Sequence, residues 1–277
     1  TNTKKILTIH SKGSHISELR EVPALSNNFK IKLKDFSKRE KTVFSSFDIV
    51  TFPSSAAYNL FLSDLQISEH SSDKIKIIYN GINVNRINSI QPENILEKYK
   101  INKQDFDLTL LNVAQHVKPK NFDLIIKSIK ILNDKHKIRT LLINIGEGYL
   151  TDYYEEIIKE NSLENQVRFL GMISNDDVIR LMKSLDIFIQ ASEKVVFDLV
   201  VLEALQSRIK VIVSNEGGNK EIIKNNFNGL LLEELNEEYI ADKVFSSINF
   251  VPNFDPNSFE QKYSISRMVE DYYNLYK

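Results

Sequence analysis

Polar and glycine residues gather directly after five short apolar runs in the second half of the chain. Glycines in such segments let backbone N–H groups come close to a ligand or form a site for an anion. Lys120 opens a helical pattern and could neutralise a phosphate, although a glycine after a strand more often only makes a turn. The five segments are 115–120, 146–148, 171–173, 192–198 and 215–218.

Glu203 is a second candidate, because it lies inside the apolar stretch VVFDLVVLEAL. An unpaired buried carboxylate costs several kcal/mol, so this group needs a partner or a ligand hydroxyl. The simpler alternative is that Glu203 only faces the open end of a sheet. We favour a ligand role, because its helix would begin at the edge of the sheet where ligands bind.

Apolar, β-branched runs alternate with segments of helical period from about residue 104 onward. Phe122, Ile125 and Ile129 recur at helical spacing, and Ser174 with Asp177 forms a capping box ahead of another helix. This repetition predicts an α/β fold with a Rossmann-like domain at 104–250, in which helices cover both faces of a parallel sheet. The expected strands are 108–114, 140–145, 167–171, 186–190 and 209–214.

The first hundred residues carry fewer signals. Strand-like runs at 4–10, 47–54 and 74–81 predict about three strands, too few for a complete doubly wound domain. The tail at 258–277 has helical spacing. The expected organisation is a partial N-terminal domain at 1–90, a linker at 91–103, the domain at 104–250 and a C-terminal helix at 251–277 that crosses back to the first domain.

The composition excludes several classes of protein. The 277 residues include 36 Lys+Arg and 37 Asp+Glu, a net charge of −1, without the basic excess that nucleic-acid binding would need. No apolar run approaches the roughly 18 residues of a transmembrane helix. Cys is absent, which excludes disulfides and thiol chemistry and favours a reducing, cytoplasmic setting.

Taken in order, the motifs resemble those of the retaining glycosyltransferases of family 4. The resemblance covers about 45–235 and implies the GT-B fold of two facing Rossmann-like domains, with the C-terminal domain complete and the N-terminal domain partial. The motifs that carry it are KIKIIYNGINVNRI (74–87), LLNVAQHVKPKNFDLIIKSIKIL (110–132), INIGEGY, VRFLGMI and DIFIQAS (143–192), LEAL (202–205) and SNEGGNKEII…NGLLL (214–232).

The resemblance implies roles for individual residues of a donor site. Lys120 would hold the donor diphosphate and Glu203 the nucleotide ribose. Substitutions stand at other family positions: Gln115 replaces an Arg, Asn121 a Gly and Val195 the first of two glutamates. Either Glu193 or Asp198 could replace that missing glutamate. The full donor-binding set is Gln115, Lys120, Gly146, Met172, Ile173, Val195, Asp198, Glu203, Gly217 and Gly218, with Met172 and Ile173 contacting the base through their backbone and Gly217 and Gly218 preceding the helix of Glu221.

The run LTIHSKGSH at 7–15 resembles the first-domain strand that carries the family's active-site histidine. It assigns His10 as catalytic together with Glu203, with His15 as the alternative. If so, the chain begins partway through the first domain. A truncated chain, a naturally shortened protein and a partner chain that supplies the rest are the three explanations left open.

The expected function is transfer of a sugar from a nucleotide-diphosphate sugar, such as a UDP- or GDP-sugar, to a glycan or lipid-linked acceptor with retention of configuration. Polysaccharide or glycoconjugate synthesis is the expected setting, without metal or cofactor. The basic stretch at 29–41 is either a solvated helix face or a peripheral contact with the inner face of the membrane.

Two alternatives stay open. One is a glycosyltransferase-like scaffold or partner subunit that no longer catalyses. The other is different sugar-nucleotide chemistry, such as epimerisation. The scaffold is motivated by Gln115, Val195, Asp198, Arg208 and Lys210, which depart from the family pattern.

Overall fold

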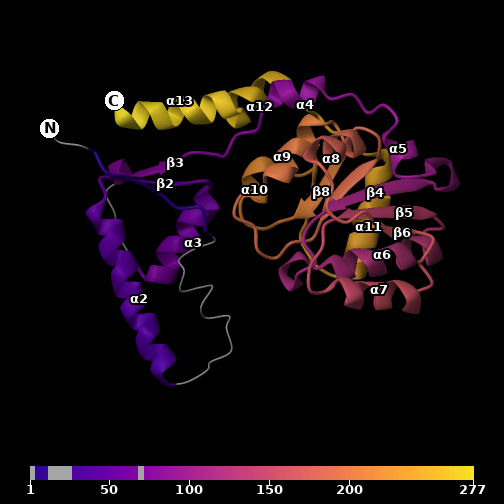
Figure 1. The fold of residues 1–277 in the computed structure, drawn as a ribbon, viewed down its shortest axis with the longest axis horizontal. Helices are drawn as coiled ribbons and strands as arrows, with labels where there is room; N and C mark the ends of the chain where they lie inside the picture. Colours follow the sequence, from indigo (N-terminus) through magenta and orange to yellow (C-terminus); the bar gives the residue numbers. More distant parts are fainter. Residues whose placement is uncertain (1–3, 12–26, 68–71) are drawn as a thin grey trace.

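A computed structural model describes residues 4–11, 27–67 and 72–277, which form two parallel β-sheets with flanking helices (Figure 1). In the described residues the first sheet has the order β1-β2-β3 and the second the order β6-β5-β4-β7-β8-β9. The strands are β1 (Ile6–Thr8), β2 (Ile49–Phe52), β3 (Ile75–Ile77), β4 (Leu108–Val113), β5 (Thr140–Ile145), β6 (Val167–Phe169), β7 (Ile187–Gln190), β8 (Lys210–Ser214) and β9 (Leu230–Leu232).

All of the pairings between these strands are parallel, with Leu110 opposite Ile187 at the centre of the larger sheet. The α/β prediction is therefore confirmed, and so is the alternation of strands and helices in the second half. The side chains of β5 are all buried, because helices cover both faces of a parallel sheet.

The helices are α2 (Asn27–Ser46), α3 (Ser55–Leu65), α4 (Val84–Ser89), α5 (Ile95–Lys98), α6 (Phe122–Asp134), α7 (Thr151–Glu160), α8 (Asn175–Met182), α9 (Leu199–Gln206), α10 (Asn219–Ile222), α11 (Glu237–Ser246), α12 (Pro256–Tyr263) and α13 (Ile265–Tyr276). One apolar core joins α8 and α9 to the larger sheet, and α4 packs there too. A second core joins α6, α7 and α11 to the opposite face. Because the sheet is fixed on both faces, the loops at its edges are held in place.

The C-terminal tail differs from the single helix expected at 258–277. Ser264 has an extended backbone between α12 and α13, and its side chain accepts a hydrogen bond from the N–H of Arg267. The backbone of Ile82 pairs on both sides of this break, since its N–H donates to Tyr263 O and its O accepts from the N–H of Ile265. The continuous helix is therefore interrupted at Ser264, because the neighbouring backbone groups of Tyr263 and Ile265 form hydrogen bonds with the distant Ile82.

Beyond this break, α13 runs back across the top of the molecule toward the first sheet, as Figure 1 shows in yellow. The Tyr272 hydroxyl lies 3.5 Å from that of Thr51 on β2. Strand β9 and helix α11 are further elements that the sequence interpretation did not identify. In the part of the chain described here, no helix combines the length and apolar character needed to cross a membrane.

Candidate functional site

The loops after β4 and β5 pack backbone against backbone at the carboxyl edge of the larger sheet. A Cβ added at Gly146 would lie 2.0 Å from Ala114 O, and one at Gly148 would lie 2.4 Å from His116 O. Gly146 also has a φ of 141°, in the region that favours glycine. These two glycines are therefore explained by the close contact of the loops, whether or not a ligand also uses them.

Lys120 lies at the end of a 3-10 turn, Lys118–Lys120, and is half-buried. Asn121 follows in the left-handed region with a φ of 47°, which Asn tolerates better than most residues other than Gly. Its Nδ2 donates to Ala191 O and to Glu193 Oε1, each at 3.1 Å. Asn121 therefore makes the backbone turn expected of a glycine and also ties this loop to the one after β7.

The Asp198 side chain lies in the loop that leads from β7 into α9. It forms a hydrogen bond with the Gln190 side chain and is attracted by the Lys120 charge. Within the described residues its Oδ2 is buried and has no hydrogen-bond partner. Burial raises the pKa of Asp198, and the Lys120 charge and the Gln190 hydrogen bond oppose that shift. A cation and a carboxyl group that is costly to ionise thus share this edge.

Val195 belongs to the same loop, but its side chain is only 2% exposed. A Cβ on Gly217 would lie 1.8 Å from Val195 O, and one on Gly218 would lie 2.6 Å from Val196 O. The two glycines thus let the loop before α10 pack directly on 195–196. Any contact between Val195 and a ligand would have to use its backbone.

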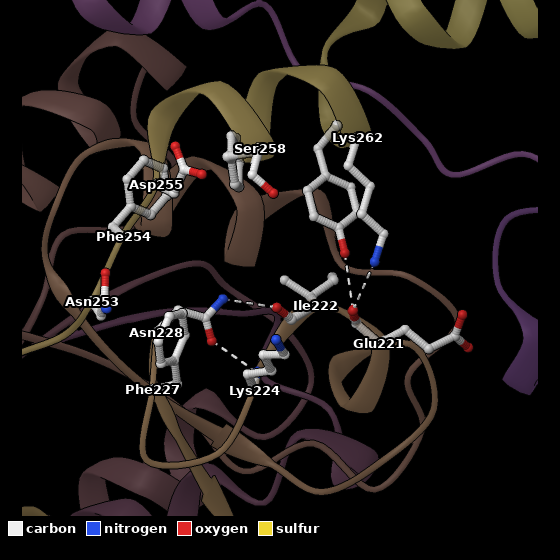
Figure 2. A pocket seen from close by; sticks show the side chains of 12 residues that line it. Glu221, Ile222, Lys224, Phe227, Asn228, Asn253, Phe254, Asp255, Ser258 and Lys262 are labelled. Carbon is white, nitrogen blue, oxygen red and sulfur yellow. Dashed lines mark hydrogen bonds between the residues drawn. The ribbon is translucent and has the colours of Figure 1, made fainter.

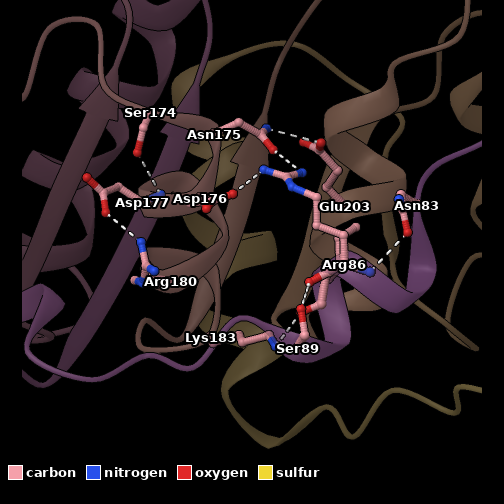
Figure 3. A network of polar contacts seen from close by, with 11 residues as sticks. Asn83, Arg86, Ser89, Ser174, Asn175, Asp176, Asp177, Arg180, Lys183 and Glu203 are labelled. Carbon is pink, nitrogen blue, oxygen red and sulfur yellow. Dashed lines mark hydrogen bonds and ion pairs between the residues drawn. The ribbon is translucent and has the colours of Figure 1, made fainter.

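Glu203 is half-buried on α9, where side chains from three helices converge (Figure 3). Asn175 Nδ2 donates to Glu203 Oε1 at 3.1 Å, and Arg86 Nη1 donates to Asn175 Oδ1 at 2.8 Å. Arg86 also forms an ion pair with Asp176. Burial raises the pKa of Glu203, while the Asn175 hydrogen bond and the Arg86 charge lower it. The carboxylate is therefore oriented by α8 and α4.

The other candidates of this edge differ in exposure. Met172 is 75% exposed, and Ile173 is half-buried against the core. Gln115 is exposed in the loop after β4. The structure therefore places the sequence-predicted donor residues on neighbouring loops of one sheet edge, with Glu203 one turn further along α9.

His10 lies at the corresponding edge of the first sheet. It is exposed two residues beyond β1, and the preceding Ile9 donates its N–H to Thr51 O of β2 at 2.9 Å. The two edges meet nearby, because Ser54 Oγ donates to Val196 O at 2.9 Å. His15 lies outside the described residues.

The sequence interpretation missed a buried histidine beside the phosphate-binding candidates. His116 Nδ1 lies 2.7 Å from Thr151 Oγ1, and its Nε2 lies 2.7 Å from Asn144 Oδ1. Asn144 Nδ2 donates in turn to Asn112 Oδ1 at 2.9 Å. This chain of hydrogen bonds positions the loop of Gln115 and Lys120 against α7. The sequence did offer one signal for this network, because Asn112 and Asn144 are polar residues at matching positions of the apolar strands β4 and β5.

Arg86, Asn175 and Gln190 were also missed. Gln190 is a lone amide in an apolar strand, which could have marked it. Arg86 and Asn175 had no such signal, because they meet Glu203 only through helix packing. Among the described residues, no group of three or more His, Asp or Glu side chains is arranged to hold a metal ion.

The larger sheet and its helices match a known protein family. Residues 93–249 match the family model described as glycosyl transferases group 1. The chain belongs to this family. A glycosyltransferase of Methanocaldococcus jannaschii, described as uncharacterized, is 32% identical over 213 residues, which cover 74% of this chain and 54% of that protein.

One further relative and one solved structure are informative for this group 1 chain. The alpha-monoglucosyldiacylglycerol synthase of Streptococcus pneumoniae is 27% identical over 225 residues, 79% of this chain and 49% of that protein. The structure of Anabaena HepE in complex with UDP-glucose matches with a TM-score of 0.77 at 17% identity and covers 98% of this chain and 71% of that one. That likeness shows the GT-B type of fold. The chain spans about half the length of the curated relatives it matches.

Proposed function

We propose that the chain binds a nucleoside-diphosphate sugar at the carboxyl edge of the larger sheet. It would transfer the sugar to a glycan or lipid-linked acceptor, with retention of configuration. The observation that carries this proposal is Glu203, a half-buried carboxylate that Asn175 orients on the helix beginning directly after Asp198. A fixed acceptor group of this kind suits a pair of ribose hydroxyls, which are donors.

The chemical demand of the reaction agrees with the other groups. As the bond between the sugar and the diphosphate breaks, negative charge grows on the diphosphate and positive charge on the sugar. Lys120 and the backbone N–H groups of the glycine loops would stabilise the diphosphate. Met172 and Ile173 would contact the base through their backbone. His10, from the first sheet, would contact the sugar on its other side.

The relatives support the substrate classes of this proposal. HepE, whose fold matches this chain, was solved with UDP-glucose. The Streptococcus pneumoniae relative is named for a glucosylated diacylglycerol, which is a lipid. A lipid-linked acceptor also suits helix α2, where the basic stretch at 29–41 would contact an anionic membrane surface in the cytoplasm.

A second candidate is a scaffold that binds a partner transferase without catalysing transfer. The observation in its favour is that the Asp198 carboxyl interacts with Lys120, the cation expected to hold the diphosphate. The interior position of the Val195 side chain agrees with it as well.

Thermal unfolding with UDP, GDP and ADP, each with and without an attached sugar, tests the donor site. A ligand at one hundred times its Kd stabilises a folded protein by about 2.7 kcal/mol. We expect one base family to stabilise the chain, and Glu203→Gln and Lys120→Gln to weaken that effect. Glu160→Gln on α7 and Lys130→Gln on α6 change exposed side chains and serve as matched controls.

Two outcomes would contradict the proposal. If no nucleotide stabilises the folded chain, the donor site is absent. If a nucleotide binds but incubation with its sugar conjugate and acceptor glycans or lipids yields no transfer product, the scaffold is favoured. Where product forms, the anomeric configuration read by NMR tests retention.

A further inference from the structure

A cavity of about 230 Å³ lies between the loop that follows α10 and helix α12, away from the proposed donor residues (Figure 2). Its lining residues come from 221–228 and 253–263. None of the proposed donor residues lines it. The cavity is therefore a separate site by position, and it is large enough for a small ring with one substituent.

Aromatic side chains make the walls of this cavity. Phe254 and Phe259 have ring centroids 5.0 Å apart, and Phe259 and Tyr263 have centroids 5.3 Å apart. Phe227 adds a ring that is 44% exposed. Such walls favour a flat apolar ring, which can stack on them or meet their edges.

Two ammonium groups belong to the same cavity, those of Lys224 and Lys262. Lys262 Nζ lies 4.9 Å from the ring centroid of Tyr79 and 5.0 Å from that of Tyr263, and Lys224 Nζ lies 5.4 Å from that of Phe227. In the residues that the structure describes, neither ammonium lies within 4.0 Å of a carboxylate oxygen.

The nearby acidic groups already have other partners. The Glu221 carboxylate accepts hydrogen bonds from the N–H groups of Ser55 and Ala56 and from the Tyr79 hydroxyl. Asp255 Oδ1 accepts from the N–H of Asn257 at the start of α12. Neither carboxylate is therefore paired directly with Lys224 or Lys262, although the Glu221 charge still acts on Lys262. Among the described residues, Lys262 Nζ donates only to the backbone oxygen of Glu221, at 3.5 Å.

The electrostatics of Lys262 agree with that geometry. Burial lowers the pKa of Lys262; the Glu221 charge raises it, and the charges of Arg267 and Lys224 lower it. Arg267 itself forms an ion pair with Asp271 at 2.8 Å. An anion placed between the two lysines would relieve their mutual repulsion.

We propose that this cavity binds an organic phosphate whose body is a flat apolar ring. The phosphate would lie between Lys224 and Lys262, because compact ammonium groups bind phosphate as point charges. The ring would pack among Phe227, Phe254 and Phe259. Nothing in the proposed sugar transfer requires this second site, so the inference does not depend on that function.

Isothermal titration calorimetry with phenyl phosphate tests the site in the whole chain. We expect saturable binding that weakens at least tenfold in the double variant Lys224→Gln, Lys262→Gln. Lys130→Gln, which changes an exposed side chain on α6, is the matched control and should bind as the unchanged chain does. Lys120→Gln should also leave the affinity unchanged, because that residue belongs to the donor edge.

The remaining outcomes overturn the proposal. Absence of saturable binding would do so, and so would a loss confined to Lys120→Gln, which would place phenyl phosphate in the donor site. Equal affinity for inorganic phosphate would remove the role of the aromatic walls. Thermal unfolding of each variant in buffer alone shows that it is folded, so a loss of binding is assigned to the lysines.

Discussion

At the scale of single residues, Asp198 is the side chain whose charge matters most for the proposed donor site. A diphosphate beside Lys120 would also lie near the Asp198 carboxyl, since the two side chains interact. Two negative groups repel, and burial makes ionisation of Asp198 more costly still. A neutral Asp198 therefore favours both the folded chain and a bound diphosphate.

We expect Asp198→Asn to tighten binding of the selected nucleoside diphosphate by about fivefold at neutral pH, a difference near 1 kcal/mol. Because burial raises the pKa of Asp198, its stabilising contribution is complete at acid pH and is lost as the pH rises through that pKa. The variant should therefore be more stable than the unchanged chain at neutral pH, and the two should converge at acid pH.

Calorimetric titrations and denaturant unfolding, each compared between the two proteins across pH, measure these differences. Asp134→Asn is a control at the end of α6, where the exposed carboxylate pairs with Lys130 instead. If Asp198→Asn weakened nucleotide-sugar binding instead, the Asp198 carboxylate would be a ligand for the sugar.

At the scale of elements, helix α2 presents apolar and basic side chains together. Phe36 and Val43 are 45% and 46% exposed, and Lys38 and Arg39 are exposed beside them in sequence. An amphipathic helix with this composition can lie on an anionic lipid surface, where each basic residue contributes about 1 kcal/mol.

We expect the chain to co-sediment with vesicles that contain phosphatidylglycerol and much less with vesicles of phosphatidylcholine alone. Lys38→Glu with Arg39→Glu should weaken the binding by at least tenfold, since two attractive charges become repulsive. Lys127→Glu with Lys130→Glu on α6 reverses as many charges elsewhere on the surface. Equal loss in both pairs would show that net charge, and not α2, governs the binding.

The elements also show what sequence alone can predict. The strands of the larger sheet other than β9 were predicted because buried apolar, β-branched runs leave a local pattern. The capping box at Ser174 was half correct: Ser174 Oγ accepts from the N–H of Asp177, but the Asp177 carboxylate bonds Lys98 and Tyr99 of a distant segment. The break at Ser264 likewise depends on a distant residue, because the backbone of Ile82 bonds both sides of the break.

In the candidate site, too, local patterns could be predicted from the sequence and contacts between distant segments could not. Lys120 and the glycines could be placed at one edge from the sequence, because they follow strands and the ends of parallel strands meet at one edge. The groups that orient Glu203 come from α4 and α8, and no local pattern records that packing.

At the scale of the whole molecule, the two sheets are joined at the proposed site itself. Ser54 bonds Val196, and the Tyr79 and Phe197 rings stack with centroids 5.4 Å apart. Glu221, on α10, accepts from the N–H groups of Ser55 at 3.1 Å and Ala56 at 2.8 Å. A carboxylate of one part thus caps the first turn of α3 in the other, where the helix dipole favours negative charge.

We therefore expect Glu221→Ala to loosen the junction without unfolding the larger sheet. Hydrogen exchange followed by mass spectrometry should show amides at 54–57 exchanging about tenfold faster, because a lost charge-assisted cap costs about 1.4 kcal/mol. Peptides from β5 should keep their protection, since both faces of that strand are covered. Glu260→Ala, at an exposed position on α12, is the control. Unchanged exchange at 54–57 would show that Ser54 and the Tyr79–Phe197 stack hold the two parts without Glu221.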